Sequence, residues 1–148
     1  MEFRDLKRQY QYLRSDMDLK IQEVINQTNF IQGKQVADLE KQLADYTGTK
    51  HCVTCANGTD ALQLALMVWN IGEGDAVFVP DFTFFSSGEV VSAVGAVPVF
   101  VDVDPDTCNI DMDSLEHMIE KTIEKGTLTP KAIITVDLFG QPADYVKI

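Results

Sequence analysis

The chain is 148 residues long with a mass of 16.5 kDa, and its 23 acidic and 12 basic residues give a formal net charge of −11. With 45% apolar and 24% charged residues, the composition excludes a disordered or collagen-like chain and suits one domain with a buried core. The acidic pI of about 4.4 argues against a nucleic-acid-binding protein, because binding phosphates requires clustered Lys and Arg.

The sequence pattern indicates a cytoplasmic protein without a membrane span. The longest apolar runs, such as residues 93–101, fall short of the roughly 20 residues that a membrane helix needs. The N-terminus is charged and helical in pattern, unlike the apolar centre of a signal peptide. The three cysteines are an odd number in a chain that has enough core, so we expect no disulfide framework.

Residues 1–48 are predicted to form an N-terminal helical segment. Apolar residues recur at steps of three and four between Phe3 and Ile25, which is the period of an amphipathic helix. The same spacing continues from Val36 to Tyr46, and Gly48 is expected to end this second helix.

Residues 49–148 alternate between short β-branched runs and helical stretches. This alternation predicts an α/β domain with a mainly parallel sheet, because each parallel pairing needs a crossover and a helix supplies it. The domain is expected to be incomplete at its C-terminus, since Asp144 can cap a helix of which only the first turn follows. The expected strands are 52–55, 76–79, 97–103 and 132–136, and the expected helices are 61–69, a helix led by 82–85 that ends at Gly95, and 113–125.

The loop Asn57-Gly58-Thr59 follows the first expected strand and begins a helix. Ligands of parallel α/β sheets bind at the carboxyl ends of strands, where a helix N-terminus offers unpaired N–H groups. Gly58 lets these N–H groups approach an anion, and Thr59 adds a hydroxyl donor. Two interpretations remain open, a phosphate site or a simple helix cap formed by Asn57, Thr59 or Asp60. The loop matches neither a nucleoside-triphosphate nor a dinucleotide fingerprint.

An aromatic run, Phe82-Thr83-Phe84-Phe85, follows the next expected strand and lies at the same edge of the sheet. A ring at this place can stack on a flat cofactor. The alternative is that each Phe belongs to the core, where Phe is usually found. A phosphate site and a ring-stacking site side by side would together accommodate one phosphorylated aromatic ligand.

Other clusters of reactive residues are assigned structural roles, and no metal site is expected. The pair Cys52 and Cys55 has redox or zinc spacing, but no second pair follows it. The aspartates from 102 to 113 do not match a calcium-binding loop, because in that alignment Thr107 occupies the position that requires Gly. They are therefore expected to form a polar turn leading into a helix. His51 and His117 have no evident catalytic partner.

Six short motifs, taken in order over residues 30–144, resemble the N-terminal part of the DegT/DnrJ/EryC1/StrS sugar aminotransferases. They are Phe30-Ile31-x-Gly33-x-x-Val36, Asn57-Gly58-Thr59-x-Ala61-Leu62, Gly74-Asp75-x-Val77-x-x-Pro80, Thr83-Phe84, Gly95-Ala96-x-Pro98-Val99-Phe100-x-Asp102-Val103 and Gly140-Gln141-Pro142-Ala143-Asp144. The resemblance implies a fold-type-I enzyme that uses pyridoxal 5′-phosphate, of which residues 49–148 are the incomplete large domain.

The resemblance also implies a function and a set of site residues. Members of the family transfer an amino group, commonly from glutamate, to a keto group on a nucleotide-linked sugar in amino-sugar or surface polysaccharide biosynthesis, and they act as homodimers. By this resemblance Gly58 and Thr59 bind the cofactor phosphate, and Phe84 covers one face of the pyridine ring. The segment Asn29-Phe30-Ile31 lies near the sugar nucleotide in relatives.

No residue of the chain is assigned a catalytic role. Pyridoxal phosphate chemistry needs a lysine that bonds to the cofactor and an acidic group at the pyridine nitrogen. In the family both follow the Gly-Gln-Pro-Ala-Asp motif, which places them beyond Ile148, and Asp137 is not the acidic partner. We therefore expect the 148-residue chain to be inactive by itself.

Three other functions remain as alternatives. A dehydratase of the same fold carries histidine in place of the lysine. A non-catalytic module that binds a phosphorylated ligand would use the same Asn57-Gly58-Thr59 loop, and it would be a compact monomer. A flavodoxin-like or nucleotide-binding oxidoreductase domain is disfavoured, because the glycine fingerprint is absent.

Overall fold

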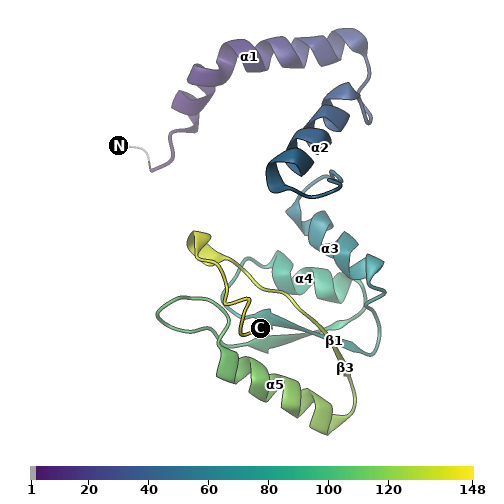
Figure 1. Cartoon of the computed structure of the whole chain (residues 1–148), viewed down its shortest axis with the longest axis vertical. Helices are drawn as coiled ribbons and strands as arrows, with labels where there is room; N and C mark the ends of the chain where they lie inside the picture. The colour runs from purple at the N-terminus through teal and green to yellow at the C-terminus, as the bar shows by residue number, and fades with distance from the viewer. Residues whose placement is uncertain (1–2) are drawn as a thin grey trace. The chain divides into compact units, whose positions relative to one another are not determined.

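The computed structural model describes residues 3–148, which divide into two compact units with the boundary between Thr54 and Cys55. The first unit is helical, and the second contains a parallel sheet with helices on its faces (Figure 1). In chain order the elements of the described residues are α1 (Leu6–Gln27), α2 (Lys34–Thr47), α3 (Gly58–Val68), β1 (Asp75–Pro80), α4 (Ser86–Ala93), β2 (Val97–Val101), α5 (Met112–Lys125), β3 (Thr129–Ile133) and the short 3-10 helix η1 (Leu138–Gly140).

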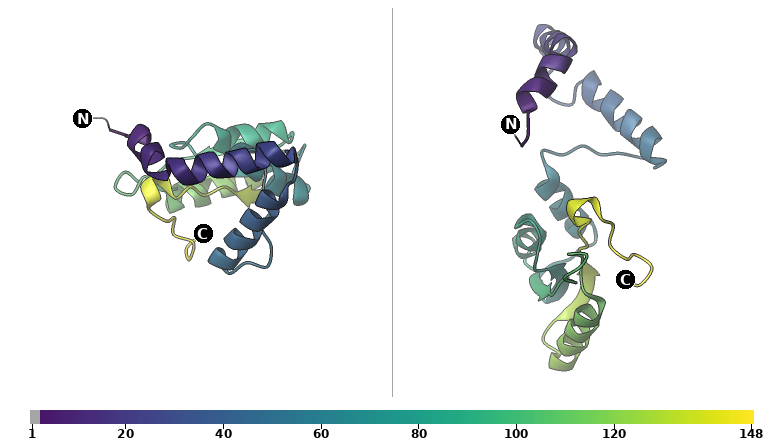
Figure 2. Two further views of the ribbon diagram at one scale, coloured as in Figure 1. Left: turned by 90° about the horizontal axis from the view of Figure 1, so that it is seen from above. Right: turned by 90° about the vertical axis from the view of Figure 1, so that its left-hand side faces the viewer.

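The first unit consists of α1 and α2, joined by residues 28–33 (Figure 2). Asp5 caps α1, and its carboxylate accepts a hydrogen bond of 2.8 Å from the backbone N–H of Arg8. Gly48 ends α2 in the left-handed conformation at φ 71°, which glycine adopts without steric cost. Both predicted helices and the predicted stop at Gly48 are therefore confirmed.

The helix α1 buries none of its residues. Its apolar positions form the stripe that the spacing predicted, yet Leu6 and Ile21 keep 67% and 54% of their surface exposed. An amphipathic helix gains most of its stability from packing its apolar face. Within the first unit, α1 thus presents an exposed apolar stripe.

The second unit contains a three-stranded sheet in the order β2-β1-β3, with β1 paired in parallel to both neighbours. The helix α4 connects β1 to β2, and α5 connects β2 to β3. The helices α3 and α4 cover one face of the sheet, and α5 covers the other (Figure 1). This arrangement confirms the predicted α/β fold with a parallel sheet.

The core consists of two clusters because successive residues of β1 point to opposite faces. The first cluster includes Leu66 of α3, Val77 and Val79 of β1, and Val90 and Val91 of α4. The second includes Ala76 and Phe78 of β1, Val101 of β2, Ile110, and Leu115 of α5. Every residue from Ala76 to Pro80 is buried, as expected for the central strand of a sheet covered on both faces.

The prediction of a strand at residues 52–55 is wrong, because these residues have no regular structure. A strand requires a neighbouring strand for its backbone groups, and the backbone N–H of Thr54 instead donates to the Glu40 carboxylate at 2.9 Å. The Thr54 hydroxyl donates to the same oxygen. These two hydrogen bonds lower the pKa of Glu40, with the backbone N–H as the larger cause.

The last strand also differs from its expected position, since β3 spans Thr129–Ile133 rather than 132–136. The pairing with β1 shifts register by one residue, so that Ala76 lies opposite Pro130 but Val77 lies opposite Ala132. Proline lacks a backbone N–H and is tolerated in strands at such irregularities. The alternation of apolar and polar residues in the sequence does not by itself predict this register shift.

We predict that the 148-residue chain associates at micromolar concentration through exposed apolar surface such as the α1 stripe. Sedimentation velocity over a concentration series should show a rising mean mass. The double variant Leu6→Glu and Ile21→Glu should reduce this association, whereas the control Gln9→Glu and Gln22→Glu should not. A monomer throughout the series would contradict the prediction.

Candidate functional site

The loop before α3 lies where the sequence predicted a ligand site, and Asn57 provides the helix cap. Its backbone is extended, with φ −164° and ψ 176°, and its side-chain oxygen accepts from the N–H of Asp60 at 2.9 Å. The Asn57 amide group also donates to the Asp60 carboxylate at 3.3 Å. Among the three candidates for the cap, the structure therefore selects Asn57 and leaves Thr59 available for another role.

The backbone N–H groups of Gly58 and Thr59 precede the first hydrogen bond of the helix. That bond runs from the N–H of Ala61 to the carbonyl of Asn57 at 3.2 Å. A Cβ built on Gly58 would meet no atom within 4 Å, so the space beside this residue is open. N–H groups without an intrahelical partner at a helix N-terminus, with open space beside the first residue, are a favourable arrangement for binding an anion.

The hydroxyl of Thr59 meets the hydroxyl of Ser86 at an Oγ1···Oγ distance of 2.8 Å. Ser86 is the first residue of α4 and is only 6% exposed, so this hydrogen bond joins the N-terminal turns of α3 and α4. A second pair, Thr83 and Ser87, lies beside it with an oxygen–oxygen distance of 3.1 Å. Neither Ser86 nor Ser87 was predicted as a site residue from the sequence. The feature of the sequence that could have indicated them is a pair of serines at the start of a helix.

Phe84 lies two residues before Ser86, and its carbonyl accepts the N–H of Ser87 at 3.1 Å. The side chains of Phe84 and Phe85 are each 76% exposed, and Phe82 is 51% exposed. The interpretation of these rings as core residues is therefore wrong. Phe84 lines a pocket of about 390 Å³ together with Pro80, Gly88 and Phe100, at the carboxyl end of β1.

The aspartates between residues 102 and 113 form the expected polar turn. Asp104 accepts from the backbone N–H and the hydroxyl of Thr107 at 2.8 and 3.0 Å, and these bonds lower its pKa, the backbone bond being the larger cause. Asp111 caps α5 by accepting from the N–H of Ser114 at 2.7 Å. Among the described residues, no group of three His, Cys, Asp or Glu side chains is arranged to hold a metal ion.

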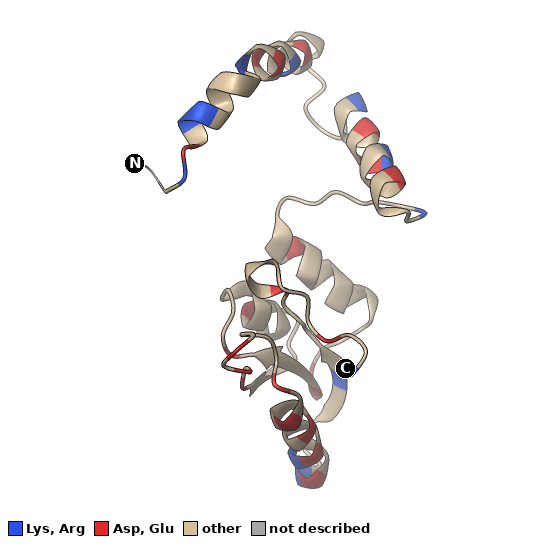
Figure 3. Cartoon of the chain, turned by 60° about the vertical axis from the view of Figure 1, so that its left-hand side comes forward, with Lys and Arg blue, Asp and Glu red and all other residues tan. Residues whose placement is uncertain are grey.

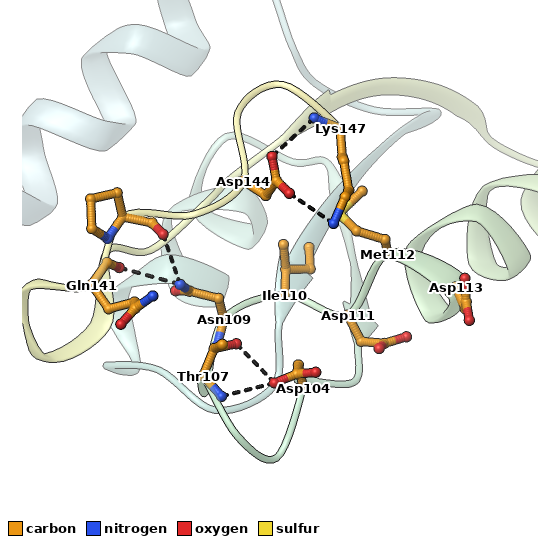
Figure 4. A pocket seen from close by; sticks show the side chains of 11 residues that line it. Asp104, Thr107, Asn109, Ile110, Asp111, Met112, Asp113, Gln141, Asp144 and Lys147 are labelled. Atoms are coloured by element: carbon orange, nitrogen blue, oxygen red, sulfur yellow. Dashed lines mark hydrogen bonds and ion pairs between the residues drawn. The ribbon is translucent and has the colours of Figure 1, made fainter.

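The C-terminal residues pack on this turn through Asn109 (Figure 4). The buried Asn109 amide group donates to the carbonyls of Gln141 and Pro142 at 3.3 and 3.0 Å. Asp144 accepts from the N–H of Lys147 and pairs with its ammonium group at 2.9 Å, so the expected turn after Asp144 is present. Together with the turn at Asp104, these residues line a pocket of about 500 Å³.

Asp137 holds the segment that follows β3. One of its carboxylate oxygens accepts from the N–H of Ala143 at 3.0 Å and from the hydroxyl of Tyr145 at 2.8 Å. Both bonds lower the pKa of Asp137, with the Ala143 N–H as the larger cause. The structure thus gives Asp137 an anchoring role within the chain.

The cysteines form no disulfide bond within the part of the chain that the structure describes. The three cysteines are free, and Cys52 and Cys55 fall in different units. No helix in the described range 3–148 is both long and apolar enough to cross a membrane.

Comparison with known proteins establishes the family. The sequence pattern of the DegT/DnrJ/EryC1/StrS aminotransferase family matches residues 11–148, and the chain belongs to this family. The chain is 45% identical over 145 residues to a UDP-2-acetamido-2-deoxy-3-oxo-D-glucuronate aminotransferase of Pseudomonas aeruginosa. This match covers 98% of the chain but 38% of that enzyme, so the chain spans little more than a third of this relative.

Solved structures agree in fold. A DegT/DnrJ/EryC1/StrS aminotransferase from Brucella abortus superposes with a TM-score of 0.95 at 50% identity, covering 99% of this chain and 39% of that one. Spr1654 from Streptococcus pneumoniae in its PLP form gives a TM-score of 0.74 at 37% identity, with 86% and 31% covered. The fold is therefore that of the N-terminal part of a fold-type-I large domain, and pyridoxal phosphate is the cofactor of the family, as the sequence predicted.

We expect Asn57→Ala to lower the free energy of unfolding of the chain by about 1 kcal/mol, the usual value of an N-cap. Asn57→Asp keeps the side-chain acceptor and should stay close to the original stability. Urea unfolding followed by circular dichroism measures both variants. Equal stability of Asn57→Ala and the original chain would show that the cap contributes nothing.

Removing the Tyr145 hydroxyl should raise the pKa of Asp137. Because this pKa is lowered in the folded chain, its hydrogen bonds stabilise the fold above the pKa of the unfolded state, and this stability is lost as the pH falls through the folded value. NMR titration of the Asp137 carboxyl carbon in Tyr145→Phe should show a smaller depression. Tyr46→Phe is the control and should leave the Asp137 pKa unchanged; an unchanged value in Tyr145→Phe would refute the assignment.

Proposed function

We propose that this chain is the N-terminal part of a pyridoxal phosphate-dependent aminotransferase that acts on a keto sugar linked to a nucleotide. Family membership and the 45% identity to an enzyme named for a UDP-linked keto sugar support the substrate class. The observation that carries the proposal is the N-terminus of α3 at Gly58 and Thr59, where the space beside Gly58 is open. The ring of Phe84, which precedes α4, is also exposed.

The residues of the chain fit the cofactor. The N–H groups of Gly58 and Thr59 would donate to the phosphate, and the positive end of the α3 dipole would favour its negative charge. The ring of Phe84 is exposed and would cover one face of the pyridine ring. When bound, the cofactor supplies an electron sink for exchanging an amino group between a donor and a keto acceptor.

The proposal includes the donor and the assembly. Glutamate is the proposed amino donor, and a cytoplasmic homodimer is the proposed form of the full-length enzyme. Exposed apolar surface such as the α1 stripe is consistent with further contacts in that enzyme. The lysine that bonds to the cofactor and the acid at its pyridine nitrogen are proposed to lie outside this chain, so residues 1–148 supply cofactor binding without catalysis.

A direct test compares the 148-residue chain with the full-length protein. Each is mixed with pyridoxal phosphate, glutamate and a UDP-linked 3-keto sugar, and amino-sugar formation is followed by mass spectrometry. We expect the full-length protein to form the amino sugar and the isolated chain to form none. Steady turnover by the isolated chain would overturn its proposed inactivity, and loss of water from the sugar without amino transfer would overturn the aminotransferase assignment.

A further inference from the structure

We propose that Ser86 is a positioning residue for the cofactor phosphate and acts by orienting the hydroxyl of Thr59. This inference rests on the proposed function of the Gly58 and Thr59 loop. It adds a residue that lies 27 positions away in the sequence from Thr59 and on a different helix. The contact that carries it is the hydrogen bond of 2.8 Å between the two hydroxyl groups.

The direction of this hydrogen bond decides what Thr59 can do. A hydroxyl group has one proton, and a phosphate oxygen accepts only from a donor. If Thr59 donates to Ser86, the Thr59 proton is not available for a hydrogen bond to the phosphate. If Ser86 donates to the oxygen of Thr59, the Thr59 proton is free to point toward the phosphate. The distance permits either direction, so a bound anion selects the second.

The burial of Ser86 makes this orientation effective. Ser86 is 6% exposed, whereas Thr59 is half-buried. Water therefore competes poorly for the Ser86 proton, and hydrogen bonds in sequence strengthen one another in such surroundings. Once a bound anion has selected this direction, the burial of Ser86 keeps its proton on the Thr59 oxygen.

The charge of the second unit increases the importance of this donor. Residues 55–148 contain 15 acidic residues and four lysines, and no arginine. The lysines lie at 121, 125, 131 and 147, on or after α5, whereas Thr59 and Ser86 are on the helices of the opposite face. Within the second unit, backbone N–H groups and hydroxyls must therefore bind the phosphate without help from a cationic side chain at the loop.

Ser87 provides a matched control. It is also 6% exposed and lies one residue further along α4. Its hydroxyl pairs with Thr83 at 3.1 Å instead of Thr59. A substitution of Ser87 removes the same group from the same helix while leaving the Thr59 contact intact.

The test measures cofactor binding to the full-length apoprotein by fluorescence titration, with pyridoxal 5′-phosphate and with pyridoxal, which lacks the phosphate. We expect Ser86→Ala to weaken binding of the phosphorylated cofactor about 5- to 10-fold, the value of one hydrogen bond between neutral groups. Binding of pyridoxal should be unchanged. Ser87→Ala should leave both affinities unchanged.

A double-mutant cycle tests whether Ser86 acts through Thr59. Thr59→Val should weaken phosphate-dependent binding, and adding Ser86→Ala to it should have less than about a 2-fold further effect. Thr59→Ser restores a hydroxyl and should restore sensitivity to Ser86→Ala. Thermal unfolding of each apoprotein confirms that the variants are folded.

Three results would overturn the inference: Ser86→Ala without effect on cofactor affinity, equal losses for pyridoxal and its phosphate, or a full effect of Ser86→Ala in the Thr59→Val background. Failure of the proposed function has a different signature. In that case the original full-length protein would show no preference for pyridoxal 5′-phosphate over pyridoxal.

Discussion

The parallel pairing of β1 with β2 and β3 is the constraint on which the second unit depends. Parallel neighbours require crossover connections, and α4 and α5 supply them. Every strand therefore ends at the same edge of the sheet, and α3 and α4 begin there. The alternation along β1 then assigns Val77 and Val79 to one helical layer, and Ala76 and Phe78 to the other. The N-terminal turn of α4 lies at this edge because α4 follows β1, and Ser86 of that turn hydrogen-bonds to Thr59 of α3.

The electrostatics of the second unit are unusual for a domain that binds an anion. All of the net charge of −11 resides in residues 55–148, because the acidic and basic residues of the first 54 positions are equal in number. Acidic positions are concentrated on α5 and the loop that precedes it (Figure 3). An anion site in such a unit depends on short-range donors with fixed directions, since the long-range field repels the ligand. The open N–H groups of α3 and the neighbouring hydroxyls are donors of this kind.

The two units differ in what stabilises them. The second unit has two apolar clusters on opposite faces of a buried strand, whereas α1 in the first unit buries none of its residues. Local signals favour α1, namely the Asp5 cap, the three-four spacing and salt bridges such as Arg14 with Asp18. They do not provide a partner for its apolar stripe.

The sequence by itself determined the features that depend on near neighbours in the chain. Helical spacing predicted α1, α2 and α5, Gly48 ended α2, and the Asn57-Gly58-Thr59 motif located the helix N-terminus that faces open space. Only the tertiary structure decided the features that need a distant partner. Residues 52–55 lack a neighbouring strand, β3 shifts register at Pro130, and Phe84 is exposed rather than buried. The hydrogen bond between Thr59 and Ser86 also depends on a distant partner. The hydrophobic period of a sequence predicts which face of an element a residue occupies, but not which residue of another element it contacts.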